Sequence, residues 1–296
     1  MSFSLVSEGN SPVVNVMIMT AQKAAKGLIR DFGELEKLQA AKGVGGFASA
    51  ADKRAEAIII DELAKARPEY AILAEESGLI RPLKEVSQFD KNYGFRWIVD
   101  PLDGSQNFTH GIAHFAISIA VARFDEVIAG IVFNPVTDEM FLAEKGRGAF
   151  LNKQRLRVSG AASLSDMIVA TGSTFGFRGA RDAGARLQTV AERAGTVRHF
   201  GASSLDLAFV AAGRFGAFFE RRVKEWDVSA GALLVREAGG TVSLTSYNGP
   251  HSNEDFQRHR NEQPSATNSF HNSEYSCSIL ASNLQVHTEL KSLVCL

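Results

Sequence analysis

Acidic residues that could act together stand at separated places in this 296-residue chain. The densest motif is WIVDPLDGSQNF, residues 97–108, where an apolar run leads into Asp100, Pro101 and a second aspartate, Asp103. Proline presets φ, and Asp-Gly accepts the conformations that follow, so this motif predicts a turn. Such a turn would bend the backbone enough for both carboxylates to point into one volume. An ordinary surface turn uses the same residues, so the prediction of a site depends on other acids.

Two further motifs supply such acids. Glu75 and Glu76 follow a short apolar stretch, and Asp227 follows Trp226 where a helix is expected to begin. Taken singly, Glu76 fits a solvated loop and Asp227 fits a first helical turn, where the helix dipole favours negative charge. Taken together, clustered carboxylates need cations. Hard divalent ions bind oxygen ligands, and magnesium keeps waters and substrate phosphates in its shell.

The three motifs, in this order, resemble the signature of the inositol monophosphatase family, and most of all its bacterial branch of extragenic suppressor phosphatases. The resemblance rests on residues 97–108, on residues 226–231 with Glu237 to Gly240, and on residues 74–77. It covers about residues 13–244 and resumes near residue 276. It implies an α+β class and a layered αβαβα sugar-phosphatase fold.

The resemblance also implies two to three Mg²⁺ ions per active site. Glu75, Asp100 and the carbonyl of Leu102 would bind the first ion, and Asp100, Asp103 and Asp227 the second. A third, weaker ion would bind Glu75 and waters. Packed acids and paired ions suit attack on a phosphate monoester by a water that the metal activates.

The same resemblance assigns catalytic roles to Glu75, Asp100 and Ser105. The Ser105 hydroxyl would help Glu75 to orient the attacking water. Backbone N–H groups of Gly104 and Ser105 would bind the phosphate at the start of a short helix. The residues that would contact the substrate's hydroxyl groups are Asp103, Ser203, Glu220 and Asp227.

The sequence departs from the family pattern at several positions. Serine replaces the common threonine at Ser49 and Ser105, and Gly46 stands where an aspartate is common. Residues 201–204, Gly-Ala-Ser-Ser, vary the family's Gly-Ser/Thr-Ala-Ala run, so the substrate preference there is left open.

The implied function is magnesium-dependent, lithium-sensitive hydrolysis of inositol monophosphate and similar small polyol phosphates by a homodimer. Relatives that act on fructose bisphosphate, 3′-phosphonucleotides or histidinol phosphate are alternatives; the modest length and the lack of an evident second basic pocket disfavour the first two. A different alternative is a regulatory partner of transcription or RNA-processing machinery, with phosphatase activity secondary.

Composition agrees with a globular enzyme. Hydrophobic residues make up 45% and charged residues 22%, and the formal net charge of −1 gives no indication of nucleic-acid binding. Two cysteines, Cys277 and Cys295, do not form a disulfide framework, which favours a reducing compartment. We expect a cytoplasmic protein, because the N-terminus lacks a secretory pattern and no apolar run is long enough to span a bilayer.

Apolar periodicity predicts how the chain is organised. We expect a helix over residues 13–40 and a second helix, opened by a capping box at Ser49 to Asp52, that stops near Pro68. Residues 1–152 would form an N-terminal unit with helices on a largely antiparallel sheet. Residues 153–296 would form an α/β unit, with residues 246–274 as a polar loop insertion.

Overall fold

The computed structural model describes residues 9–38, 47–172, 181–247 and 276–294. Its first two helices are α1, Pro12–Leu38, and α2, Phe47–Ala66. Apolar residues three or four apart in α1 are buried, so one face packs inward: Ala21, Ala25, Leu28 and Phe32. Both helices match the predicted ranges. Gly46, one of the departures from the family pattern, lies outside the described residues.

A first sheet follows the helices along the chain, in the order β2-β1-β3-β4-β5-β6-β7-β8. Only the β1–β3 pair is parallel, so the predicted, largely antiparallel sheet is confirmed. The strands are β1 Ala71–Ala74, β2 Gly78–Ile80, β3 Phe95–Asp103, β4 Ala116–Arg123, β5 Glu126–Asn134, β6 Glu139–Glu144, β7 Gly148–Leu151 and β8 Gln154–Arg155. A short helix, α3 Ser105–Thr109, follows β3.

A second sheet has the order β10-β9-β11-β13-β12, with parallel pairing around β9 and antiparallel pairing around β13. Its strands are β9 Ile168–Thr171, β10 Thr196–Arg198, β11 Ala217–Val223, β12 Thr241–Tyr247 and β13 Ser276–Ser282. The helices of this part are α4 Arg181–Ala191, α5 Ser203–Ala211, α6 Glu225–Glu237 and α8 Leu284–Val294, besides a 3₁₀ turn at Leu164–Asp166.

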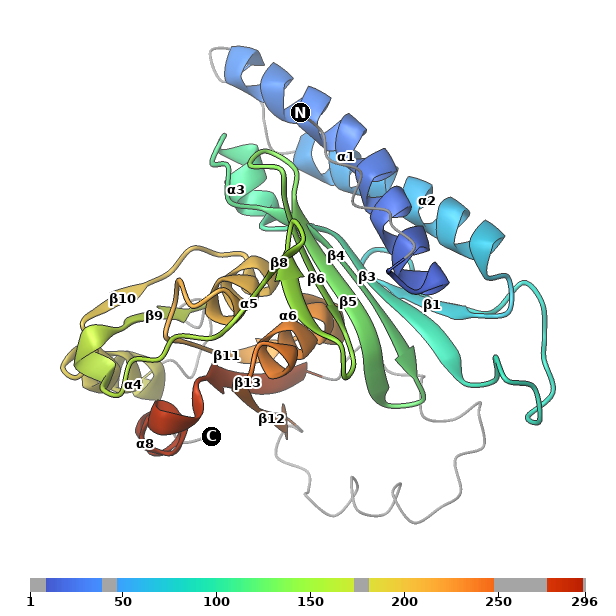
Figure 1. Cartoon of the computed structure of the whole chain (residues 1–296). Helices are drawn as coiled ribbons and strands as arrows, with labels where there is room; N and C mark the ends of the chain where they lie inside the picture. Colours follow the sequence, from blue (N-terminus) through green and yellow to red (C-terminus); the bar gives the residue numbers. More distant parts are fainter. Residues whose placement is uncertain (1–8, 39–46, 173–180, 248–275, 295–296) are drawn as a thin grey trace.

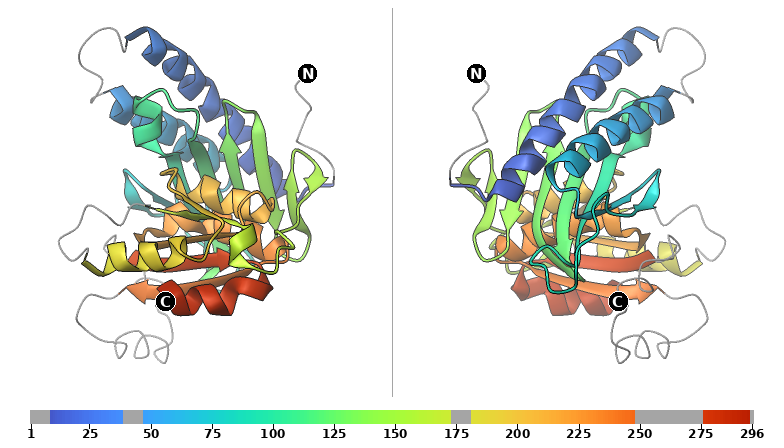
Figure 2. Two further views of the ribbon diagram at one scale, coloured as in Figure 1. Left: turned by 90° about the vertical axis from the view of Figure 1, so that its left-hand side faces the viewer. Right: turned by 90° about the vertical axis from the view of Figure 1, so that its right-hand side faces the viewer.

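The elements stack in five layers. Helices α1 and α2 cover one face of the first sheet, α5 and α6 lie between the two sheets, and α4 and α8 cover the far face of the second sheet (Figures 1 and 2). Three clusters of buried apolar residues correspond to this order, and the largest central one joins both sheets through α5 and α6. The predicted αβαβα architecture is therefore confirmed. The boundary at residues 152 and 153 remains a prediction.

Three predicted local features are wrong. The predicted turn at residues 100–103 is part of β3, which continues through Pro101 to Asp103, because pairing with β4 overrides the local turn preference. Ser49 lies inside α2 and is not its cap, since the helix already begins at Phe47. The polar segment predicted from residue 246 begins later, because β12 runs to Tyr247 beside β13; residues 248–275 lie outside the described residues.

No helix within the described ranges combines the length and the apolar character needed to cross a membrane.

The close packing of the middle helix layer on the first sheet requires a small residue in β5. A Cβ atom added at Gly130 would lie 2.8 Å from Cα of Ala230 in α6, a contact with backbone that a flexible side chain cannot relieve. Helix α6 also carries Asp227, so this packing sets the height of one acidic residue above the sheet.

We predict that Gly130→Ala destabilises the protein by roughly 1–3 kcal/mol, as overpacking of a core does. Gly27→Ala is the matched control, because nothing lies within 4 Å of its added Cβ in α1. That control should stabilise the helix by roughly 0.5–1 kcal/mol. Chemical denaturation measures both variants, and equal free energies of unfolding for Gly130→Ala and the wild type would contradict the predicted close approach.

Candidate active site

A β-bulge in β3 brings the first two carboxylates to one place. Asp100 pairs with Ser118 and Asp103 with Ala116, so β3 advances three residues while β4 advances two. The extra residue bends the strand, and proline is tolerated there because a bulge leaves an N–H unpaired. The backbone N–H of Leu102 donates to Oδ1 of Asp100 over 3.0 Å. The bulge therefore does what the sequence analysis expected of a turn.

Parallel pairing of β1 with β3 adds Glu75. Ala74 is opposite Val99, and the N–H of Glu75 donates to the carbonyl of Val99 over 3.2 Å. Glu75 therefore lies beside the start of the bulge. A side-chain hydrogen bond joins Glu75 and Asp100. Glu56 of α2 holds the turn after β1, since its carboxylate accepts from the N–H of Glu76 over 2.8 Å. Glu76 itself lies 3.8 Å from the ammonium group of Lys53, as a solvated loop residue would.

Asp227 reaches the same volume from the start of α6. Its Oδ2 accepts from the N–H of Lys224 over 2.7 Å, which caps the helix and fixes the side chain. A salt bridge joins this helix start to β3. Nη1 and Nη2 of Arg96 donate to Oε2 and Oε1 of Glu225 over 2.9 and 2.5 Å. Asp227 thus serves as a helix cap and also joins the other acids.

The four residues Glu75, Asp100, Asp103 and Asp227, here called the acid cluster, repel one another strongly. Asp100 is 2% exposed, and burial raises its pKa well above the ordinary value, with further upward contributions from each of the other three. Burial likewise raises the pKa of Asp227 to about 8, and Asp103 and Glu75 add to the shift. The cluster therefore favours protons or another cation at neutral pH.

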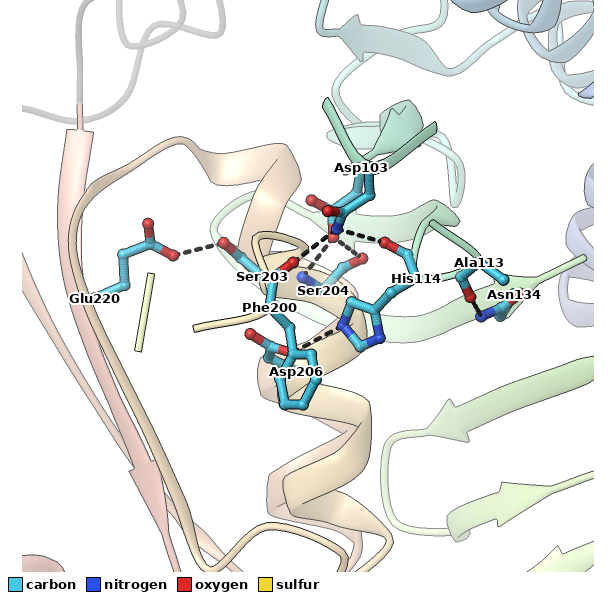
Figure 3. A network of polar contacts seen from close by, with 10 residues as sticks. Asp103, Ala113, His114, Asn134, Phe200, Ser203, Ser204, Asp206 and Glu220 are labelled. Carbon is cyan, nitrogen blue, oxygen red and sulfur yellow. Dashed lines mark hydrogen bonds and ion pairs between the residues drawn. The ribbon is translucent and has the colours of Figure 1, made fainter. Parts of the chain in front are cut away.

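Helix α5 closes the cluster from the middle layer. Its second residue, Ser204, donates to Oδ2 of Asp103 from its N–H over 2.7 Å and from its hydroxyl over 2.5 Å (Figure 3). The adjacent Ser203 donates from its hydroxyl to Oε2 of Glu220 in β11 over 2.5 Å. Two of the predicted substrate contacts, Ser203 and Glu220, are thus in contact with each other. The structure brings them to the same helix end that holds Asp103.

Gly104 and Ser105 start α3 directly after the bulge. Gly104 has φ 87°, and a Cβ atom there would lie 2.9 Å from the carbonyl oxygen of His114, so only glycine suits this position. Asn107 secures α3, because its amide donates to the carbonyls of His114 and Phe200 over 2.7 and 2.6 Å. The roles of Gly104 and Ser105 toward phosphate, and of the Leu102 carbonyl toward a metal, remain predictions.

The sequence analysis missed one member of this site. Asp52, taken there as part of a helix cap, lies inside α2 and is 5% exposed, and its Oδ1 has no hydrogen-bond partner among the described residues. Burial, Glu75, Glu76 and Glu56, in that order, raise its pKa to about 8. The available signal was its position on the buried face of α2, one residue after Ala51 and four before Glu56, both of which are also buried.

The acid cluster fits magnesium. In the described part of the chain, no three His, Cys, Asp or Glu side chains converge into a ready-made cage. Asp100, Asp103 and Asp227 each accept a backbone N–H group. Magnesium does not require such a cage: it typically takes one or two carboxylates and completes its shell with water and phosphate. Glu75, Asp100, Asp103 and Asp227 supply the hard oxygen donors, and their mutual repulsion supplies the affinity for a cation.

A five-layer αβαβα fold with buried carboxylates gathered at a strand bulge defines a protein of the sugar-phosphatase class. The chain belongs to the inositol monophosphatase family, whose model matches residues 10–285. This confirms the family that the three sequence motifs indicated.

The relatives agree with this assignment. An inositol-1-monophosphatase of Rhizobium meliloti (strain 1021) is 49% identical over 232 residues, which cover 78% of this chain and 84% of that protein. The Nus factor SuhB of Escherichia coli (strain K12) is 39% identical over 236 residues, 78% of this chain and 85% of that protein. The native structure of the extragenic suppressor protein suhB of Bartonella henselae matches 96% of this chain and 98% of its own, with a TM-score of 0.73 and 38% identity.

The raised pKa values predict how the metal-free protein responds to pH. An acid whose pKa is higher in the folded state binds more protons when folded, so the free energy of unfolding falls as pH rises between the two values. For Asp52 this window runs from its ordinary pKa of 3.8 to the raised pKa of about 8. In EDTA, the melting temperature should therefore fall from pH 5 to pH 8, and Asp52→Asn should make that fall shallower.

Thermal melts of wild type and Asp52→Asn at several pH values measure this effect. Asp61→Asn serves as control, because Asp61 of the same helix is exposed and pairs with Lys65. Parallel pH curves for the wild type and Asp52→Asn would show that Asp52 does not titrate between these values.

Proposed function

We propose that this protein hydrolyses inositol monophosphate and related small polyol phosphate monoesters in the presence of magnesium. The observation that carries the proposal is the position of Asp100: it is buried, and three other acids, Asp103, Glu75 and Asp227, raise its pKa further. A buried group of this kind is stable at neutral pH when a divalent cation neutralises it. Membership in the family and its inositol-1-monophosphatase relatives supply the reaction class, a phosphoric monoester hydrolase.

The residues that we assign to two or three Mg²⁺ ions are Glu75, Asp100, the carbonyl of Leu102, Asp103 and Asp227. When bound, magnesium neutralises the phosphate dianion and polarises water and the leaving oxygen. Glu75 would accept the proton of the attacking water, because it adjoins the bulge that holds Asp100. Burial raises the pKa of Glu75 in the metal-free protein.

The other side chains orient the ester. The N–H groups of Gly104 and Ser105 donate to phosphate oxygens at the start of α3, where the left-handed conformation of Gly104 turns the backbone. Asp103, Ser203, Glu220 and Asp227 would bind substrate hydroxyl groups. Holding both ends of the substrate keeps the phosphorus in line with the attacking water, which converts binding energy into rate.

A regulatory role is the second candidate, because relatives at 39–40% identity are named Nus factor SuhB. We propose that binding to transcription machinery coexists with hydrolysis in a cytoplasmic homodimer that lithium inhibits. A metal-ligand variant separates the two functions: Asp227→Asn should lose turnover and still co-purify with its partner.

Phosphate release from inositol monophosphate should require magnesium and should be inhibited by calcium, whose larger and more flexible coordination disturbs an in-line reaction. A panel of phosphate monoesters, including fructose bisphosphate, 3′-phosphonucleotide and histidinol phosphate, assayed with magnesium identifies the preferred substrate. Full activity in excess EDTA would rule out the proposed metal dependence.

Asp103→Asn and Asp227→Asn each remove one negative charge and nearly preserve shape. Both should lower kcat by several orders of magnitude. The lost carboxylate charge would help to hold the magnesium ion that stabilises the negative charge developing on the leaving oxygen in the transition state. Steady-state kinetics with saturating magnesium measure the change, and Asp61→Asn again serves as control. Retention of more than about a tenth of wild-type kcat, a barrier change below about 1.4 kcal/mol, would show that the residue is structural.

A further inference from the structure

Two consecutive residues at the start of α5, Ser203 and Ser204, carry hydroxyl groups. Each hydroxyl binds a different carboxylate: that of Ser203 binds Glu220, and that of Ser204 binds Asp103 (Figure 3).

Ser204 is the more constrained of the two. It is 0% exposed, and its N–H and its hydroxyl both donate to the same oxygen, Oδ2 of Asp103. A carboxylate oxygen has two lone pairs in its plane, so two donors fill Oδ2. Of the two carboxylate oxygens of Asp103, Oδ1 is therefore the one that α5 leaves able to bind another group.

The backbone N–H alone would not fix the carboxylate as well. With one donor, Oδ2 keeps a free lone pair, and the group can rotate about its terminal torsion, which is broad in aspartate. With the hydroxyl as a second donor, a rotation that exchanges the two carboxylate oxygens of Asp103 must break two buried hydrogen bonds and not one. Magnesium demands near-ideal octahedral geometry, so a ligand with one fixed oxygen binds it better than one that samples several orientations.

We propose that Ser204 is a positioning residue that fixes Asp103 as a one-oxygen magnesium ligand through Oδ1. The proposal rests on the proposed assignment of Asp103 to the metal. Hydrogen-bond partners of metal ligands typically contribute 10–100-fold to metal affinity. Ser204 supplies this contribution through its two hydrogen bonds to Asp103.

The test is isothermal titration of the metal-free protein with magnesium, without substrate. Ser204→Ala should weaken the binding of one magnesium ion about tenfold. Ser204→Cys keeps the volume and a weak donor, should give an intermediate value, and serves if the alanine variant does not fold. The matched control is Ser282→Ala, which removes an equally buried hydroxyl that donates to a backbone carbonyl, that of Asn283, over 2.9 Å.

A double-mutant cycle shows whether Ser204 acts through Asp103. In the Asp103→Asn background, Ser204→Ala should cause no further loss of magnesium affinity. The proposal is wrong if Ser204→Ala binds magnesium as the wild type does, if Ser282→Ala weakens binding equally, or if the two losses add. Because titration needs no turnover, a wild type that binds magnesium but hydrolyses no ester would refute the proposed function and leave this result intact.

Discussion

Mutual repulsion among buried carboxylates is the constraint on which the rest of this structure depends. Four acids from three separate parts of the chain share one volume, and burial raises the pKa of each. Such a group remains charged only when something positive or strongly hydrogen-bonding faces it. The fold supplies backbone N–H groups and the ends of helices for that purpose, and the proposed magnesium ions would supply the remainder.

The five layers provide the rigidity that this arrangement needs. Asp100 and Asp103 belong to a central strand, and Asp227 belongs to a helix packed between two sheets. The approach of α6 to Gly130 and the Arg96–Glu225 salt bridge fix that helix on the first sheet. Carboxylates held by such elements cannot move apart to relieve repulsion, so the energy is available for binding a cation.

The middle helix layer connects two acids of the proposed site. The start of α5 holds Asp103 through Ser204 and Glu220 through Ser203, and these acids come from different sheets. One helix end therefore sets the positions of a proposed metal ligand and of a proposed substrate contact together.

The sequence by itself determined the family, the layered fold class and four acids of the site, Glu75, Asp100, Asp103 and Asp227, because motifs such as Trp97 to Phe108 combine residue types that few other structures require. It did not determine local geometry. Residues 100–103 favour a turn by their own preferences, but pairing with β4 makes them a bulge. Asp52 resembles a helix cap in sequence, and only the packing of α2 beside β1 shows it facing Glu75. The role of Ser204 depends on a contact between residues 101 positions apart. Register, burial and such distant contacts arise from the whole fold, so only the tertiary structure decided them.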